Sequence, residues 1–369
     1  MSVVSIIRCK SYEEQDVYEA VRTATTHAGL PDCKGKRVLL KPNVLSDAPV
    51  EKAVTTNPVV LECMIRLLQE QGAKEVLVGD SPGLQGSHFT PKACGISKVC
   101  EETGATWVDF TKDTREQEIP FTGGMRLPFS KVLDAVDLII TLPKMKTHKL
   151  MYATGALKNQ FGLVPGLNKS KSHVLKQSRG AFADLIVGIN TLHKPAFAVM
   201  DGIIGMEGEG PANGSPRFLG LVLASQDLVA LDWAEGIVMG YQPMDLPLVK
   251  SALGHGLGTK PTFPDLDAGT LQVKDWKRIP IQKKEHLFRD LILPFLTRRL
   301  RHGPRRPAPV FGSPKCVLCQ RCVHICPAQA LSVRNKRIII DTHACVRCYC
   351  CHEMCPVGAI TIDEREPAG

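Results

Sequence analysis

Short apolar runs alternate along most of the chain with stretches whose apolar residues recur at helical spacing. The runs predict strands and the periodic stretches predict helices. This regular order is typical of βαβ units, which build a largely parallel sheet. The expected strands are Val3–Ile7, Arg37–Lys41, Glu75–Gly79, Thr106–Phe110, Leu138–Leu142, Ala196–Met200 and Phe218–Ala224. The expected helices are Glu13–Ala28, Pro58–Gln71, Pro91–Thr103, Phe182–Leu192 and Leu228–Met239.

The pattern divides the chain into three parts. Residues 1–285 are expected to form an α/β domain, an open and largely parallel sheet with helices on both faces. Residues 286–312 predict a linker, amphipathic at first and then rich in Pro and Arg. We expect its first part to pack on its own domain; the alternative is an anionic membrane surface or a partner. Residues 313–369 predict a small α+β domain.

The cysteines are concentrated in this last part. Nine of the fourteen lie between Cys316 and Cys355, and eight of these nine form two runs that repeat at an offset of 29 residues. The offset continues beyond them, since Ala330 matches Ala359 and Leu331 matches Ile360. The two runs, each followed by proline, are Cys316-x2-Cys319-x2-Cys322-x3-Cys326-Pro327 and Cys345-x2-Cys348-x2-Cys351-x3-Cys355-Pro356. The tail is therefore an internal duplication.

Each run has the spacing of the bacterial [4Fe–4S] ferredoxins, and residues 313–364 resemble two-cluster members of that class. Three thiolates wrap one cluster, while the fourth comes from the other run. One cluster would thus take Cys316, Cys319, Cys322 and Cys355, and the other Cys345, Cys348, Cys351 and Cys326. Zinc favours two local pairs of ligands, and disulfides need an oxidising compartment, so both are disfavoured. Cys350 is extra, either a silent buried thiol, which we favour, or a replacement ligand for Cys351.

Composition adds limits. The net charge of +9 fits several partners, including an acidic redox protein. No signal-peptide pattern and no apolar run of membrane-spanning length interrupts the sequence, so we expect a cytoplasmic protein without a membrane span. The scattered cysteines are expected to be buried apolar residues. They are Cys9, Cys33, Cys63, Cys94 and Cys100.

Polar and cationic residues follow the predicted strands. Ligands of open α/β sheets bind at the carboxyl ends of the strands, so we expect these residues to share one site for an anionic small molecule. No P-loop and no Gly-x-Gly-x-x-Gly strand-to-helix turn is present. His148 and His173 are the candidates for proton transfer. The candidate substrate ligands are Lys41, Asn43, Asp80, Lys144, Lys146, Lys158, Asn159, Asp201 and Glu207.

Over residues 35–250 the body resembles the family named domain of unknown function 362, whose members often carry a ferredoxin-like tail. The resemblance implies the fold and the tail, and it brings no agreed substrate. It rests on an ordered series of short motifs: Leu40-Lys41-Pro42-Asn43, Gly79-Asp80-Ser81-Pro82-Gly83, Leu142-Pro143-Lys144-Met145-Lys146-Thr147-His148, Gly155-Ala156-Leu157-Lys158-Asn159, His173, Asp184, Asp201-Gly202, Glu207-Gly208-x-Gly210-Pro211 and Ser225-x-Asp227-x2-Ala230-x-Asp232.

Two functions fit these features. The first is a reductase that passes electrons from two [4Fe–4S] clusters to an anionic molecule on the α/β domain. The second is an electron carrier or redox sensor whose α/β domain binds a protein partner. A ferredoxin- or flavodoxin-like protein is the expected low-potential donor or acceptor. Nucleic acid is not expected, since no basic stripe is interleaved with aromatic residues. The sequence leaves two questions open: whether the protein catalyses a reaction, and which oligomeric state it adopts.

Overall fold

The computed structural model describes residues 1–84, 89–281 and 306–362. Within these residues the main sheet has nine strands, in the order β10-β9-β11-β8-β3-β4-β5, with β12 beside β11 and β2 beside β12. The strands from β5 to β11, and β9 beside β11, pair in parallel, whereas β12, β2 and β10 pair antiparallel. The predicted largely parallel α/β fold is confirmed. The strands are β2 Ser5–Arg8, β3 Arg37–Pro42, β4 Glu75–Gly79, β5 Thr106–Val108, β8 Leu138–Leu142, β9 Lys144–His148, β10 Tyr152–Ala153, β11 Phe197–Glu207 and β12 Ser215–Ser225.

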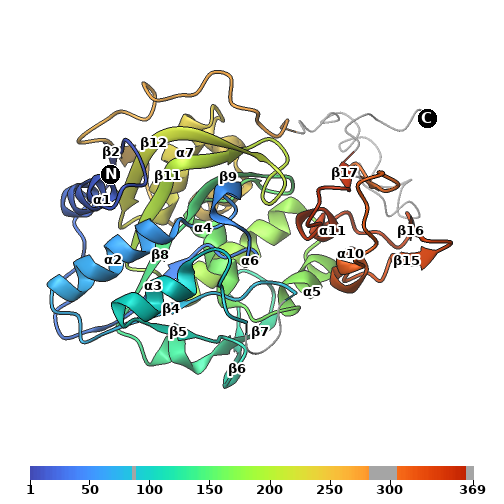
Figure 1. The fold of residues 1–369 in the computed structure, drawn as a ribbon, viewed down its shortest axis with the longest axis horizontal. Coiled ribbons are helices and arrows are strands. Elements are labelled where there is room, and N and C mark those ends of the chain that lie inside the picture. Colours follow the sequence, from blue (N-terminus) through green and yellow to red (C-terminus); the bar gives the residue numbers. More distant parts are fainter. Residues whose placement is uncertain (85–88, 282–305, 363–369) are drawn as a thin grey trace.

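Helices cover both faces of this sheet (Figure 1). Successive strand residues point to opposite faces, so Val38 and Leu40 belong to one core and Leu39 to the other. The first core includes α1 Glu14–His27, α2 Pro58–Glu70 and α3 Ile96–Thr103; the second includes α4 Gly155–Asn159, α6 Arg179–Leu192, α7 Leu228–Val238 and α8 Pro247–Gly254. Local sequence sets the ends: the Asn57 side chain accepts from the Val59 N–H at 2.9 Å, with proline opening α2.

The body differs from its predicted elements at the polar strand ends. The Lys144–His148 motif was expected only to follow a strand, but it forms strand β9 itself. Its two lysines are buried and hydrogen-bonded. Pro143 separates it from β8, and β11 pairs first with β8 and then with β9. Helix α5 Asn168–Leu175 and the hairpin of β6 Thr114–Glu118 and β7 Arg126–Ser130 had no apolar pattern that predicted them. β1 Ser2–Val3 pairs with β13 Pro261–Thr262.

The tail repeats its sequence duplication in three dimensions. Non-glycine residues with positive φ recur at the offset of the sequence: Leu318 at 52° matches Arg347 at 52°, and Gln320 at 59° matches Tyr349 at 67°. The short helices α10 Arg321–Ile325 and α11 Cys350–Glu353 follow these turns. β15 Leu331–Arg334 and β16 Arg337–Ile340 form a hairpin, and β14 Pro309–Val310 pairs with β17 Thr361–Ile362. Both halves therefore adopt the same chain path.

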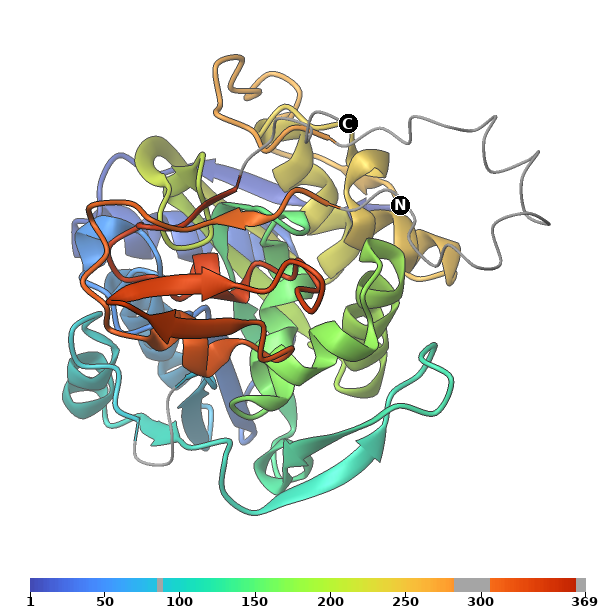
Figure 2. The same cartoon turned by 90° about the vertical axis from the view of Figure 1, so that its right-hand side faces the viewer.

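The tail lies against one end of the body, with α11 nearest to it and the β15–β16 hairpin farthest away (Figures 1 and 2). The Asn213 amide donates to the His352 carbonyl at 3.0 Å, and the His352 ring lies 3.2 Å from the Glu209 carboxylate. Glu209 also pairs with Lys149 at 2.6 Å. The predicted amphipathic segment at 286–302 lies outside the described residues. Among those described, none of the helices combines the length and apolar character that crossing a bilayer requires.

Candidate functional site

A buried polar network lies at the carboxyl ends of β3, β4 and β9. The Lys41 ammonium lies 3.0 Å from an Asp80 carboxylate oxygen and 3.3 Å from the Asn159 amide oxygen. Asn159 accepts from the Asn43 amide at 3.0 Å, and Asn43 in turn accepts from Lys146 at 2.6 Å. The five side chains come from four separate motifs of the sequence, since Lys41 and Asn43 share one. The fold thus joins five of the predicted site residues into one connected array.

The network keeps its charges in place by pairing them. Lys41 and Lys146 are almost completely buried, and an unpaired ammonium there would be costly. Burial lowers the pKa of Lys41, and the adjacent Asp80 partly offsets this. Burial, with the charges of Lys158 and Lys144, lowers the pKa of Lys146 to about 7. Asp80 is fixed by the N–H groups of Val44 at 2.6 Å and Ser81 at 2.8 Å.

Gly162 is necessary for this arrangement. A Cβ atom at this position would lie 1.9 Å from Asp80 Oδ1 and 2.6 Å from Lys41 Nζ. Any side chain would therefore separate the ion pair or displace the backbone between Gly155 and Gly162. The glycine that closes this motif is explained by the close approach of its backbone to a buried charge pair.

A cavity of about 100 Å³ lies above the network, between the body and the tail. The body contributes the loops after β3 and β4 and the segment from α4 to α5. The tail contributes Ile325 from α10 and Cys350, Glu353 and Met354 from the second cysteine run. The cavity is therefore complete only when the tail is docked. The predicted site residues among its lining are Asn43, Asp80, Lys158, Asn159 and His173.

Two ammonium groups line the cavity. Lys169 donates to the carbonyl oxygens of Val164, at 2.6 Å, and Ser81, and burial lowers its pKa to about 7. In the described part of the chain Lys158 has no hydrogen-bond or ion-pair partner. Burial lowers the pKa of Lys158, while Glu353, Cys350 and Asp80 act in the opposite direction. Lys158 is thus the cation that is free to bind a ligand.

The two candidate histidines occupy different places. His148 Nδ1 accepts from the N–H groups of Leu150 at 3.1 Å and Met151 at 3.3 Å, so the proton of the neutral ring resides on Nε2. That nitrogen lies 3.1 Å from Glu353 Oε1 of the tail. Burial, with Lys158, lowers the pKa of His148 to about 4. His148 therefore connects body and tail beside the cavity and does not line it.

His173 lines the cavity itself. Its ring stacks on Phe182 with centroids 4.2 Å apart and meets Phe161 edge to face at 6.2 Å. Burial lowers the pKa of His173 to about 3, so the ring is neutral at physiological pH. A neutral imidazole presents one donor and one acceptor to a bound molecule. The aromatic contacts fix the direction in which these groups point.

A second pocket lies inside the tail. Its lining includes Cys326 together with Cys345, Cys348 and Cys351, the four sulfurs that the sequence assigned to one cluster. The Cys326 and Cys355 sulfurs accept the N–H groups of Ala330 and Ala359, at 3.3 and 3.2 Å, so these contacts repeat at the offset of the duplication. In the described residues no three His, Cys, Asp or Glu side chains are arranged to hold one metal ion. A donor set made only of thiols fits an iron–sulfur cluster.

The remaining sulfurs lie around the other half of the tail. Burial raises the pKa of Cys322 to about 11, and the nearby Cys319 and Cys355 add to this. Cys316 and Cys319 are exposed, whereas the cysteines of the second run from Cys348 onward are buried. The scattered cysteines of the body are all buried, as predicted. Cys350 is buried too, and it lines both the tail pocket and the cavity above the network.

Five predicted substrate ligands do not line the cavity: Lys41 and Lys146 belong to the network beneath it, and Lys144, Asp201 and Glu207 have other partners. Lys144 lies 2.7 Å from Asp201, and Tyr12 bridges the two, at 2.8 Å from the lysine and 2.7 Å from the carboxylate. Glu207 pairs with Arg217 at 3.2 Å. The cavity residues that sequence analysis missed include Ser81, Lys169 and Glu353. Ser81 stood inside a quoted motif, but Lys169 and Glu353 lie in segments whose approach to the strand ends depends on tertiary structure.

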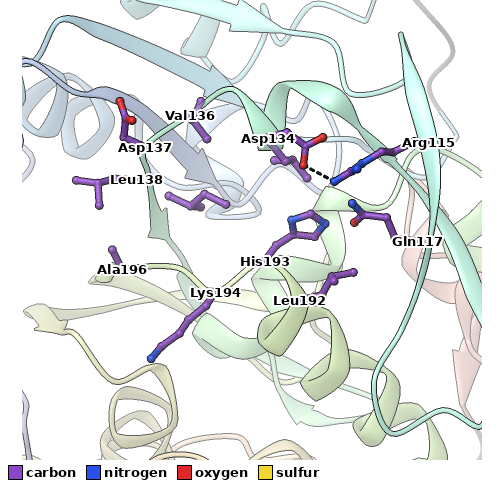
Figure 3. Close-up of a pocket in the computed structure, with 12 residues that line it drawn as sticks. Arg115, Gln117, Asp134, Val136, Asp137, Leu138, Leu192, His193, Lys194 and Ala196 are labelled. Atoms are coloured by element: carbon purple, nitrogen blue, oxygen red, sulfur yellow. Dashed lines mark hydrogen bonds and ion pairs between the residues drawn. The ribbon is translucent and has the colours of Figure 1, made fainter.

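Another cavity, of about 320 Å³, opens at the amino ends of the strands, next to the starts of β8 and β11 (Figure 3). Figure 3 shows the His193 ring next to Arg115, which pairs with Asp134 at 2.5 Å, while Lys194 points away from them. Burial lowers the pKa of His193 to about 4. This cavity at the amino ends of the strands contains none of the motif residues. We therefore assign the candidate site to the opposite edge of the sheet.

The fold and the site together define a class: an α/β protein with a polar strand-end site covered by a cysteine-rich tail. Within it, the chain belongs to the family described as Domain of unknown function (DUF362), whose model matches residues 38–235. A thylakoid-associated protein of Synechocystis sp. is 31% identical over 283 residues, which are 74% of this chain and 87% of the relative.

Two solved structures resemble the chain more distantly. One is a Thermotoga maritima protein from a structural genomics target, with a TM-score of 0.38 and 14% identity over 57% of this chain. The other is the lactate racemase apoprotein of Thermoanaerobacterium thermosaccharolyticum, with a TM-score of 0.44 and 11% identity over 64% of this chain. The chain spans 55% and 57% of the lengths of these two structures.

Replacing Gly162 tests the network. We expect Gly162→Ala to lower the free energy of unfolding by about 3 kcal/mol or more, because the new methyl group separates the buried Lys41–Asp80 pair. The matched control is Gly180→Ala in α6, where a Cβ meets no atom within 4 Å. Urea unfolding followed by tryptophan fluorescence measures both. Equal stability of the two variants would contradict the proposed role of Gly162.

His173, which lines the cavity, predicts a pH dependence of stability. The unfolded chain protonates His173 near its ordinary pKa of 6.5, but the folded chain does so only near 3. Stability should therefore fall as the pH drops from 6.5 toward 3. We expect His173→Gln to flatten this slope by up to about 1.4 kcal/mol per pH unit, whereas His343→Gln, at an exposed site, leaves it unchanged. Urea unfolding at about pH 4.5, about pH 5.5 and about pH 6.5 gives the slope of stability against pH for each variant. Equal slopes for the two variants would contradict the role assigned to His173.

Proposed function

We propose that the tail holds two [4Fe–4S] clusters and that the protein is a reductase for an anionic small molecule bound above the strand ends. One cluster is held by Cys316, Cys319, Cys322 and Cys355, and the other by Cys345, Cys348, Cys351 and Cys326. The observation that carries the proposal is the position of Cys350, which lines both the pocket framed by four cysteines and the cavity framed by the body. Electron source and substrate would thus be neighbours.

When bound, the clusters supply single electrons at low potential. The chain itself provides the binding groups. Lys158 and Lys169 stabilise negative charge on the substrate, and the tail excludes water by closing the cavity. His173, held neutral between aromatic rings, offers a hydrogen bond to the molecule beside it, and its neutral ring has no acidic proton to transfer at physiological pH. Asp80 is already paired with Lys41, and this pair forms the floor of the cavity. The ammonium groups of Lys158 and Lys169 therefore remain for the ligand.

The two ends of the tail differ in a way that suits an electron path. Cys316 and Cys319 of the first run are exposed, and the exposed Lys315 and Arg321 flank them. An acidic ferredoxin- or flavodoxin-like donor would be steered to this end, and its association would weaken with salt. The second run faces the body. Electrons would therefore enter at the exposed run and leave at the cavity, in a protein of the reducing cytoplasm.

The same exposed run favours a second function, an electron carrier or sensor with no substrate of its own. In that case the reduced tail would deliver electrons to another protein, and the body would only hold it. The two functions differ in what the cavity residues do: in a carrier, removing the Lys158 charge has no effect on the oxidation of the clusters.

Iron content tests the ligand sets. We expect about eight iron atoms per chain after anaerobic purification. Cys326→Ser and Cys355→Ser should each lose about half of them, because each removes the ligand that one run lends to the other cluster. Cys33→Ser, at a buried cysteine of the body, is the control and should keep the full content. Iron analysis and electron paramagnetic resonance of the reduced samples measure the loss; zinc in place of iron would contradict the assignment.

Reoxidation of the reduced clusters tests the reductase. We expect fractions of small anionic metabolites to bleach the reduced spectrum faster than buffer does, under anaerobic conditions. Lys158→Met should slow this reaction about tenfold or more, since it removes the free cation but keeps the length of the side chain. Lys171→Met, at an exposed position of α5, is the matched control. If no fraction reoxidises the clusters but an acidic partner protein does, the carrier function replaces the reductase.

A further inference from the structure

The cavity between body and tail has two kinds of wall. On one side are nitrogen groups with unused hydrogen-bonding capacity: within residues 1–84, 89–281 and 306–362, neither Lys158 nor His173 has a hydrogen-bond partner, and His173 is only 7% exposed. On the other side are the apolar side chains of Ile325 and Met354 from the tail. Buried polar groups are ordinarily satisfied, so the first wall is shaped for a ligand.

The charges around the cavity give the sign of that ligand. Four ammonium groups lie at its wall or directly beneath it, those of Lys41, Lys146, Lys158 and Lys169. Two carboxylates oppose them: Asp80 is paired with Lys41, and Glu353 lies beside His148. A positive surplus remains, and a mono- or dianion would balance it.

The dimensions limit the size. An apolar cavity of about 150 Å³ in another protein accepts benzene, which has six carbon atoms. The cavity here is about 100 Å³. It therefore accommodates on the order of four to six non-hydrogen atoms. A nucleotide or a sugar phosphate would not be enclosed, since either has several times as many atoms.

We infer that the cavity binds a short-chain organic carboxylate, with its carboxylate group on Lys158 and its apolar end against Ile325 and Met354. An inorganic oxoanion would satisfy the lysine but leave the apolar wall without contacts. This assignment names the substrate class of the proposed reductase and rests on that function for its role as substrate. Binding itself requires no electron transfer, so it can be measured separately.

The test is isothermal titration calorimetry with the anaerobically purified, cluster-loaded full chain in the absence of any reductant. The ligands are acetate, propionate, butyrate and hexanoate, with inorganic phosphate and sulfate for comparison. We expect affinity to rise about fourfold with each methylene from acetate to butyrate and to fall at hexanoate, which exceeds the cavity. Lys158→Met should weaken butyrate binding about tenfold or more, and Lys171→Met should leave it unchanged.

The outcomes are distinct. Tighter binding of phosphate or sulfate than of every carboxylate, a flat chain-length series, or equal affinity of Lys158→Met and the unmodified chain would each overturn the inference. The visible cluster spectrum checks that Lys158→Met is folded, and the series on the unmodified chain decides the matter even if it is not. Carboxylate binding without any reoxidation of reduced clusters would refute the reductase and keep the carboxylate site. Reoxidation by an inorganic anion without carboxylate binding would do the reverse.

Discussion

Burial of lysine ammonium groups at the carboxyl ends of the strands is the constraint on which the site depends. Lys41 and Lys146 have almost no exposure, and a charge so far from water must be paired or hydrogen-bonded. The Lys41–Asp80 pair, the two asparagines that continue it and the glycine that lets the backbone approach all follow from this requirement. Stability does not explain the cost, since a buried ion pair often contributes little to stability compared with apolar residues. A fixed, cationic floor for the proposed ligand would explain it.

The docked tail forms one wall of the cavity above this cationic floor. His148 reaches Glu353, and Asn213 and Glu209 hold His352, so the second cysteine run is attached to the body by polar contacts on two sides of α11. Apolar contacts add to them, since Tyr349 belongs to the core of the body. A tail that served only as an independent carrier would not need its buried face to complete a cavity. The shared wall therefore favours a body and a tail that act on one molecule.

Much of the fold could be predicted from the sequence because the central strands are buried on both faces. β4 and β8 begin and end where their apolar runs do, and the duplication of the tail was legible from cysteine spacing alone. β9 was not predictable, because Lys-Met-Lys-Thr-His has the composition of a polar loop until one knows that both ammonium groups are buried. The grouping of Lys41, Asn43 and Asp80 followed from the geometry of parallel strands. The arrival of Lys169 and Glu353 did not, since neither follows a strand of the sheet.

The duplication itself shows which half of the tail has been adapted to the body. Two positions that differ between the runs meet the body in the second run: the exposed Arg321 and His324 of the first run correspond, at the offset of 29, to the buried Cys350 and to Glu353. The ligand cysteines and the backbone turns are kept in both runs, so binding of the clusters does not require this difference. What the second run gains is a thiol that borders both pockets and a carboxylate that faces His148. Two copies of one cysteine-rich unit have thus become an exposed outer end and an inner end that lines a cavity shared with the body.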